Sequence, residues 1–152
     1  MDFLQVFEID WTRVGWHLRH LLVAYVLALP IGFNREQSDT RFGMRTFPLV
    51  AVVTCGFMLV GISVLDSTEA ESKVFQGIVT GIGFLGGGAI LKDGGSVIGT
   101  ATAASIWNTG AIGIAVAFNQ YEIAIVLSLL NYVTLRLVGG VKKQVKEAQD
   151  DQ

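Results

Sequence analysis

The chain has 152 residues, of which 51% are hydrophobic and 16% are charged, and its formal net charge is -2. Because a soluble domain carries about 25% charged residues to cover its outer surface, this composition and the mean hydropathy of +0.53 exclude an ordinary soluble globule. The charge balance also excludes the strongly basic surface of a nucleic-acid-binding protein, so we expect no nucleic-acid partner.

Long stretches without Asp, Glu, Lys or Arg occur at 46–65, 74–91 and 94–121. An uncharged apolar run of about 18 residues or more is typical of a membrane-spanning helix. The predicted spans are Trp16–Phe33, Phe47–Leu65, Val74–Leu91, one within Thr100–Phe118, and Tyr121–Val138. The predicted fold class is therefore all-α, with five transmembrane helices that form one membrane domain in the lipid bilayer at 16–138.

Residues 1–15 are predicted to form an extracytoplasmic segment before the first span. The apolar stretch 21–29 has the length of a signal-peptide core, yet the first ten residues hold three acidic side chains and no basic one. Ala28-Leu29-Pro30 also offers no small-x-small cleavage site. We therefore expect a retained helix with a proline near its inner end.

His17, Arg19 and His20 lie near the outer end of the first span. Only the two histidines share a helix face, at i and i+3, and no cysteine lies near them. Arg19 is expected to extend to the outer interface. Because Cys55 is the sole cysteine, neither an intrachain disulfide nor a cysteine-based metal cluster is expected.

The densest charged segment, 34–46, joins the first two spans and contains Arg35, Glu36 and Arg45. Its plain interpretation is a solvated determinant of topology that contacts anionic lipids. The loop after the third span contains Asp93. We hypothesise that Arg35 and Arg45 pair with Asp93, so that the two loops form one charged cytoplasmic cluster.

Orientation follows from the basic residues, because short loops rich in Lys and Arg remain in the cytoplasm. Basic residues concentrate in 34–46, at Lys92 and in 139–152, whereas 66–73 is mostly acidic and 119–122 has no basic residue. Five spans then place the N-terminus outside and the short tail 139–152 in the cytoplasm.

The third span contains Gly81-Ile82-Gly83-Phe84-Leu85-Gly86, which matches the dinucleotide-binding pattern G-x-G-x-x-G. That motif requires a strand-to-helix turn and an acidic residue about 20 positions later. Residues 100–121 contain no acidic residue, so we reject a nucleotide site.

The glycine spacing predicts helix packing instead. Gly77 and Gly81, and likewise Gly83 and Gly87, lie four residues apart and place small residues on one helix face, where another backbone can approach closely. Leucine at Gly83 is then expected to cost about 1 to 3 kcal/mol. The glycine run 86–88 weakens the helix and predicts a bend or a close backbone approach.

The fourth span is amphipathic without charge. Residues 94–99 are predicted to lie at the interface as a bent approach to it, and Thr102, Ser105 and Thr109 recur along it with Asn108 beside them. This polar stripe covers about 120° of the helix. It indicates either interhelical hydrogen bonds or a polar path. Asn108 is the costliest member to leave unpaired.

The sequence contains no Ser/His/Asp or Cys/His pattern, no pair of inward carboxylates and no Walker-type phosphate loop. We therefore expect a protein that is not an enzyme, with no catalytic residue, no cofactor and no metal site.

Four blocks of sequence, Ile31–Glu36, Gly43–Thr46, Ile78–Gly94 and Thr102–Trp107, occur in the order and spacing of a known family. They closely resemble the MgtC/SapB family of bacterial inner-membrane proteins. The resemblance implies a five-span membrane domain and an association with growth in low magnesium and with survival of pathogens inside macrophages. It also implies modulation of the F-type ATP synthase in some members. The matching residues that are candidates for a functional cluster are Arg35, Glu36, Arg45, Asp93 and Trp107, and Asn108 joins them from the polar stripe.

Three positions depart from the family pattern. The family usually has an acidic residue where this chain has Asn34, often an asparagine at Ala101, and in some members a cysteine at Asn108. Many members also carry a soluble domain after the membrane domain, whereas 139–152 is only a short tail, so functions of that domain are expected to be absent.

The leading functional hypothesis is a regulatory membrane protein that contacts itself, as a homo-oligomer, or another membrane complex such as the F-type ATP synthase. The alternative is a small oligomeric transporter or channel with a polar path along the fourth span. Saturable flux into liposomes would favour the alternative.

Overall fold

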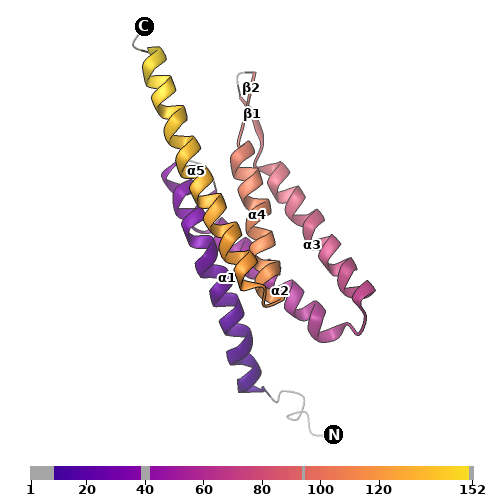
Figure 1. Ribbon diagram of the computed structural model, residues 1–152. Helices are drawn as coiled ribbons and strands as arrows, with labels where there is room; N and C mark the ends of the chain where they lie inside the picture. The colour runs from indigo at the N-terminus through magenta and orange to yellow at the C-terminus, as the bar shows by residue number, and fades with distance from the viewer. Residues whose placement is uncertain (1–8, 39–41, 94, 151–152) are drawn as a thin grey trace, which may run out of the picture.

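The computed structural model describes residues 9–38, 42–93 and 95–150, which form five helices and one small hairpin (Figure 1). The helices are α1 (Trp11–Gln37), α2 (Thr46–Val64), α3 (Thr68–Gly88), α4 (Thr100–Ala117) and α5 (Tyr121–Asp150). Strands β1 (Leu91–Asp93) and β2 (Ser96–Ile98) lie between α3 and α4. The predicted all-α class is confirmed, with the hairpin as an addition.

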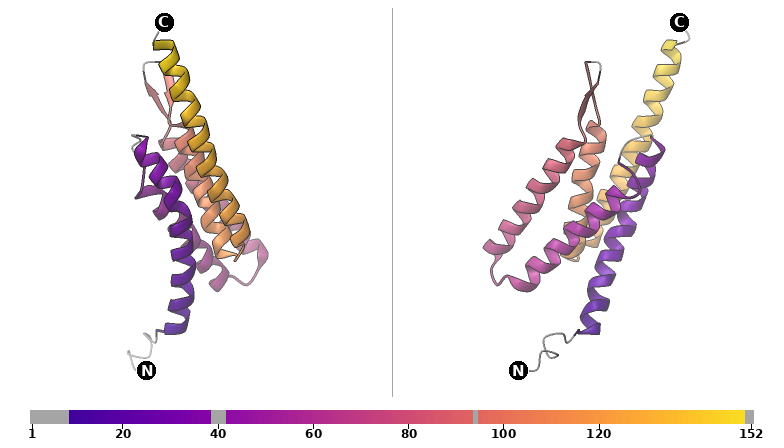
Figure 2. Two further views of the ribbon diagram at one scale, coloured as in Figure 1. Left: turned by 60° about the vertical axis from the view of Figure 1, so that its left-hand side comes forward. Right: turned by 180° about the vertical axis from the view of Figure 1, so that it is seen from behind.

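Consecutive helices run in alternating directions, so the two chain termini lie at opposite ends of the molecule (Figures 1 and 2). We call one end the hairpin end; it carries β1–β2, the α1–α2 connection and the end of α5. The other, the N-terminal end, carries the α2–α3 and α4–α5 connections. The loops predicted to face the cytoplasm thus share one end, while the side of the membrane on which that end lies stays a prediction.

Among the described residues, three helical segments are long and apolar enough to cross a membrane by length and composition: Trp11–Gln37, Thr46–Val64 and Tyr121–Gly139. Helix α3 starts with a charged first turn that contains Glu69 and Glu71. These acidic side chains favour the helix N-terminus, and neither α3 nor α4 is among the three candidate spans of the described residues.

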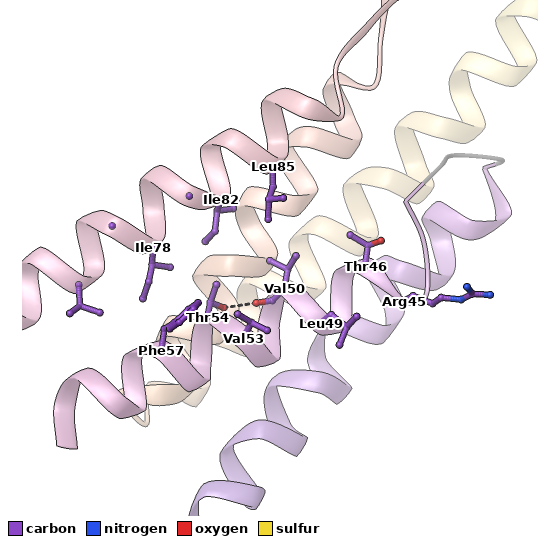
Figure 3. A pocket seen from close by; sticks show the side chains of 13 residues that line it. Arg45, Thr46, Leu49, Val50, Val53, Thr54, Phe57, Ile78, Ile82 and Leu85 are labelled. Carbon is purple, nitrogen blue, oxygen red and sulfur yellow. Dashed lines mark hydrogen bonds between the residues drawn. The ribbon is translucent and has the colours of Figure 1, made fainter. Parts of the chain in front are cut away.

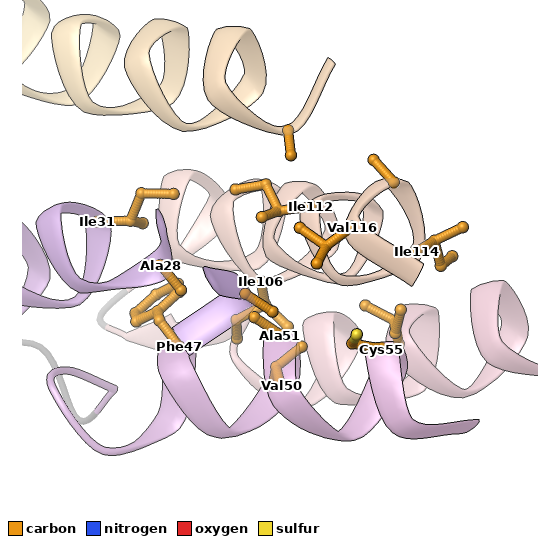
Figure 4. Packing of buried hydrophobic residues seen from close by; sticks show 14 of the residues in the cluster. Ala28, Ile31, Phe47, Val50, Ala51, Cys55, Ile106, Ile112, Ile114 and Val116 are labelled. Carbon is orange, nitrogen blue, oxygen red and sulfur yellow. The ribbon is translucent and has the colours of Figure 1, made fainter. Parts of the chain in front are cut away.

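Helix α4 is the centre of the packing and contacts α1, α2, α3 and α5. Gly113 lets α4 approach α2 closely, because a Cβ there would overlap Thr54 and the carbonyl oxygen of Ala51. Figure 4 shows Ile106, Ile112 and Val116 of α4 facing the buried residues of α1 and α2. The core is therefore built around a helix that carries no charged residue.

The first helix begins within the segment predicted as 1–15. Helix α1 begins at Trp11 because Asp10 caps it: its carboxylate accepts the backbone N–H groups of Thr12 at 2.9 Å and Arg13 at 3.2 Å. Of the segment predicted as 1–15, residues 1–8 lie outside the described residues. At the other end, α5 continues as a helix through Asp150, so the tail beyond 138 extends the fifth helix.

The third helix ends before the predicted boundary. Helix α3 stops at Gly88, and Leu91 already pairs with Ile98 in the antiparallel hairpin. The glycine run lowers the helix propensity. Gly99 then begins α4 with φ 87°, and a Cβ there would overlap the carbonyl oxygen of Ala89. The expected bent segment 94–99 thus contains the strand β2 and the N-cap of α4, with Gly94 outside the described residues.

Candidate functional site

The α1–α2 connection forms a compact unit at the hairpin end. The Glu36 carboxylate accepts the backbone N–H of Met44 at 3.0 Å. Gly43 lies directly against that carboxylate, where a Cβ would collide with it, and the Cα of Met44 lies 3.3 Å from a Cβ built at Gly32. The contacts of Glu36 and Gly32 with Gly43 and Met44 therefore fix how the chain passes from α1 into α2.

Arg35 is held on the last turn of its own helix. Its Nη2 donates to Asn34 Oδ1 at 2.9 Å and to Ser38 Oγ at 3.4 Å, and the Ser38 hydroxyl donates to the Asn34 carbonyl oxygen at 2.9 Å. Asn34 thus supplies a neutral oxygen to the half-buried guanidinium. Arg35 and Glu36 are organised side by side at one helix end.

The predicted pairing of Asp93 with Arg35 or Arg45 is wrong. In the described part of the chain the ion pairs are Arg13–Asp10 and Lys73–Glu69, and Asp93 belongs to neither. Asp93 is exposed on β1, and the hairpin projects beyond the helix ends (Figure 1). Arg45 is exposed at the start of α2, with its guanidinium directed away from α3 (Figure 3). The described residues of the two loops share one end of the molecule, where Asp93 forms an ion pair with neither Arg35 nor Arg45.

The polar stripe of α4 is a hydrogen-bonded seam with α5. Ser105 Oγ donates to Asn131 Oδ1 at 3.0 Å, and Asn108 Nδ2 donates to the Leu127 carbonyl oxygen at 3.3 Å. Within the stripe, Thr109 Oγ1 donates to the Ser105 carbonyl oxygen at 2.7 Å. Ser105 and Asn108 thus make the interhelical hydrogen bonds of the stripe, and Asn108 has a partner on the neighbouring helix.

Trp107, on the same helix as Asn108, points away from this seam. It is 55% exposed and lines an apolar groove of about 560 Å³ with residues of α3 and α5, among them Phe75, Val79 and Leu127. The two adjacent candidates therefore serve different surfaces: Asn108 closes an internal seam, and Trp107 borders an external groove.

The four glycines chosen for packing do not make close contacts inside the chain. A Cβ at Gly77, Gly81, Gly83 or Gly87 would meet no atom within 4 Å. The close approach on α3 occurs at Gly86, where a Cβ would lie 3.3 Å from the Ala103 carbonyl oxygen. Within the chain, no backbone therefore approaches the predicted small-residue face at these four glycines, because the spacing identifies such a face but not the element that covers it.

Two of these glycines border an open groove between α2 and α3. Gly77 and Gly81 line it together with Leu49, Val53 and Phe57, and its volume is about 670 Å³ (Figure 3). The lining is almost entirely apolar. In a bilayer, such a groove must be filled by lipid or by another protein helix.

A polar network that the sequence did not reveal lies at the N-terminal end. His20 is fully buried; its Nδ1 lies 2.8 Å from the Trp16 carbonyl oxygen and its Nε2 lies 2.9 Å from Asn119 Oδ1. The Tyr121 hydroxyl lies 3.1 Å from the same Nε2. These residues are about a hundred positions apart, so no local spacing could link them.

Among the described residues, no group of three or more His, Cys, Asp or Glu is placed to hold a metal ion. His17 packs edge-on against Trp16, with ring centroids 5.0 Å apart, while His20 points into its own network. The two histidines therefore face different surroundings, although they share one side of α1.

The chain is similar in sequence to a known family and to several proteins of known name. The profile of the MgtC family matches residues 21–144. The chain is 34% identical over 139 residues to Protein SrpB of Synechococcus elongatus, covering 83% of this chain and 75% of SrpB. It is 33% identical over 114 residues to Protein MgtC of Salmonella typhimurium, covering 75% of this chain and 48% of MgtC.

A third relative is YhiD of Escherichia coli, provisionally named a magnesium transporter. It is 32% identical over 124 residues, which cover 77% of this chain and 58% of YhiD. The chain thus spans about half the length of MgtC and somewhat more of YhiD. No solved structure matches the fold.

Proposed function

Since this chain belongs to the MgtC family, we propose that it is a regulatory protein of the bacterial inner membrane, without enzymatic activity, that acts through contacts between membrane helices. Its partner is a second copy of the chain or another membrane complex, such as the F-type ATP synthase. Its role lies in adaptation to low magnesium or in survival inside a host cell. The relatives named MgtC support this assignment.

Two features carry the proposal. Polar side chains of α4 are hydrogen-bonded inside the protomer, whereas the small-residue face of α3 borders an uncovered apolar groove on the outside. Ser105 and Asn108 direct their polar groups to α5, so the polar stripe is occupied within the protomer. The exposed glycines Gly77 and Gly81 border an apolar groove on the outside. Helices associate in lipid mainly where small residues let backbones approach, so this surface favours contact with another helix.

The proposed topology has five membrane crossings. Consecutive helices alternate in direction, and the N- and C-termini lie at opposite ends (Figure 1), as an odd number of crossings requires. The acidic first turn of α3 and the uncharged α4 would then cross together with the three strongly apolar helices. The basic loops place the N-terminus outside and the C-terminus in the cytoplasm.

The alternative, a small oligomeric transporter or channel along α4, draws its support from the name of YhiD. Because the polar stripe of α4 faces α5, such a path would have to form between protomers. Flux assays on the purified full chain in liposomes separate the two functions. We expect no saturable Mg²⁺ movement above that of protein-free vesicles, and saturable flux would establish the alternative.

The contact mechanism is tested in parallel by Gly81→Leu in cells. A leucine there would fill the α2–α3 groove, and we expect partner co-purification in mild detergent and growth in low magnesium to fall at normal membrane abundance. Gly15→Leu is the matched control, because a Cβ at Gly15 in α1 also meets no atom within 4 Å. Equal effects of both substitutions would contradict a specific role for the groove.

A further inference from the structure

The buried imidazole of His20 connects α1 to the α4–α5 turn through both ring nitrogens. Nδ1 faces the Trp16 carbonyl oxygen at 2.8 Å and Nε2 faces Asn119 Oδ1 at 2.9 Å. Both neighbours are oxygen acceptors, and a neutral imidazole has only one N–H to donate. A doubly protonated ring satisfies both contacts at once.

The remaining neighbours fit a cation at the same place. The Tyr121 hydroxyl lies 3.2 Å from Asn119 Oδ1 and donates to it, so that oxygen already accepts one hydrogen bond. The Trp16 ring lies over the imidazole with centroids 4.0 Å apart, and the face of an indole attracts positive charge. The side chain of Asn119 thus presents its oxygen, rather than its amide nitrogen, to His20.

The acceptor is held in position by its own backbone. Asn119 has φ 57°, a left-handed conformation that asparagine tolerates better than most residues. Its N–H donates to the Val116 carbonyl oxygen at 3.0 Å, and the Gln120 N–H donates to the Ala115 carbonyl oxygen at 2.9 Å. These two backbone hydrogen bonds position Asn119 beside the imidazole.

We propose that His20 is a proton-binding site whose second proton fastens α1 to the α4–α5 turn. With the proton bound, Nε2–H donates a charge-assisted hydrogen bond to Asn119 Oδ1, and such bonds are roughly twice as strong as neutral ones. When the proton leaves, Nε2 becomes an acceptor opposite another acceptor. The Tyr121 hydroxyl, 3.1 Å from Nε2, then turns away from Asn119 Oδ1 and donates to the ring nitrogen, and the direct contact of His20 with Asn119 weakens.

The charged and titratable groups on the elements around His20 are few, so the second proton of His20 is the charge that changes in this network. On α1, His17 is half-buried while Arg13 and Arg19 are exposed. From α5, Tyr121 reaches the ring and Glu122 is exposed, and from α2 the titratable side chain is the buried Cys55. Helix α4 carries no charged residue between Thr100 and Ala117.

This site lies at the N-terminal end, which the basic loops predict to face outward. Acid on that side would favour the fastened form of α1, the helix whose other end holds Arg35 and Glu36. The inference is independent of the proposed regulatory function, because it concerns how the molecule responds to protons rather than what it contacts.

The protonation itself is read by NMR of the full chain, labelled with ¹⁵N-histidine, in phospholipid nanodiscs. Spectra at about pH 5 and pH 8 span the range in which histidine changes charge. We expect both His20 ring nitrogens to carry protons at the lower pH, with His17→Gln used to assign the signals. A neutral His20 ring at both pH values would overturn the proposal.

The strength of the contact between α1 and the α4–α5 turn is measured by amide hydrogen exchange of residues 118–124. The rates are corrected for the intrinsic pH dependence of exchange. We expect opening to be about fivefold or more slower in acid, the factor that about 1 kcal/mol produces. His20→Gln should abolish this difference and His17→Gln should keep it. Persistence of the difference in His20→Gln would refute the mechanism.

A second variant keeps the test decisive if His20→Gln does not fold. Asn119→Gly retains the left-handed turn but removes the acceptor, so it should lose the pH-dependent protection of the segment. Asn119→Asp should increase that protection, because it places a negative charge opposite the imidazolium. Unchanged pH dependence in both Asn119 variants would overturn the assignment of Oδ1 as the acceptor.

Discussion

The Glu36 carboxylate accepts the backbone N–H of Met44 at 3.0 Å and thereby ties the end of α1 to the start of α2. The bond joins residues eight positions apart and so connects the sequence blocks Ile31–Glu36 and Gly43–Thr46. Gly43 packs against the same carboxylate. Of the adjacent residues Arg35 and Glu36, the acidic one therefore has a structural role, since it holds the two helix ends together.

Glu36→Ala should lower the free energy of unfolding by about 1 kcal/mol, the usual net contribution of one hydrogen bond. Thermal unfolding in mild detergent measures the change. Glu69→Ala is the control, because its ion pair with Lys73 is exposed and such pairs contribute about 0 to 1 kcal/mol. If Glu36→Ala is neutral, the clamp does not contribute to stability.

Gly113→Ala should destabilise the protein far more than Gly83→Ala. The added methyl at Gly113 would overlap Thr54 and the Ala51 carbonyl oxygen, whereas the one at Gly83 meets open space. Overpacking typically costs about 1 to 3 kcal/mol, while alanine in place of an open helical glycine gains up to about 1 kcal/mol. Similar melting temperatures for both variants would mean that α2 and α4 are farther apart than described.

Ser105 and Asn131 should show coupling in a double-mutant cycle of Ser105→Ala and Asn131→Ala. Hydrogen bonds between membrane helices average about 0.6 kcal/mol in such cycles, and we expect a coupling energy of that order from denaturation in detergent. Thr80→Val serves as a control, since its hydroxyl donates to its own helix at Gln76. Additive effects of the two substitutions would argue against the α4–α5 seam.

Single-cysteine labelling in cells should reveal the orientation after the buried Cys55 is replaced. A cysteine at Ser67, in the α2–α3 connection, should react with a membrane-impermeant reagent from outside. Cysteines at Gln37 and at Ser96 should react only after permeabilisation, because they lie at the hairpin end. The opposite pattern would reverse the orientation, and labelling of Ser67 and Ser96 from the same side would mean that α3 does not cross the membrane.

Asp93→Asn and Arg45→Gln should leave membrane abundance and thermal stability nearly unchanged. Both side chains are exposed and belong to no ion pair among the described residues, and such surface substitutions usually stay within about 0.5 kcal/mol. If these residues contact a partner, growth in low magnesium should fall at normal abundance. A loss of abundance would instead reveal a structural role that the geometry does not show.

The placement of helices follows closely from the sequence, because uncharged runs and local caps act over short distances. The predicted spans Phe47–Leu65 and Tyr121–Val138 coincide with α2 and the first part of α5. The largest error lies after α3, where Leu91 was expected in a helix and instead pairs with Ile98. Strand pairing depends on two segments meeting, which hydropathy does not report.

The sequence by itself determined the membrane character, the five helical segments, the family and the small-residue face of α3, since each depends on composition or on spacing within one element. Only the tertiary structure decided which surfaces meet. It pairs His20 with Asn119 across the chain, turns Asn108 toward α5 and leaves Gly83 open. Contacts between distant segments depend on how the helices cross, and that geometry comes from the packing of all five together.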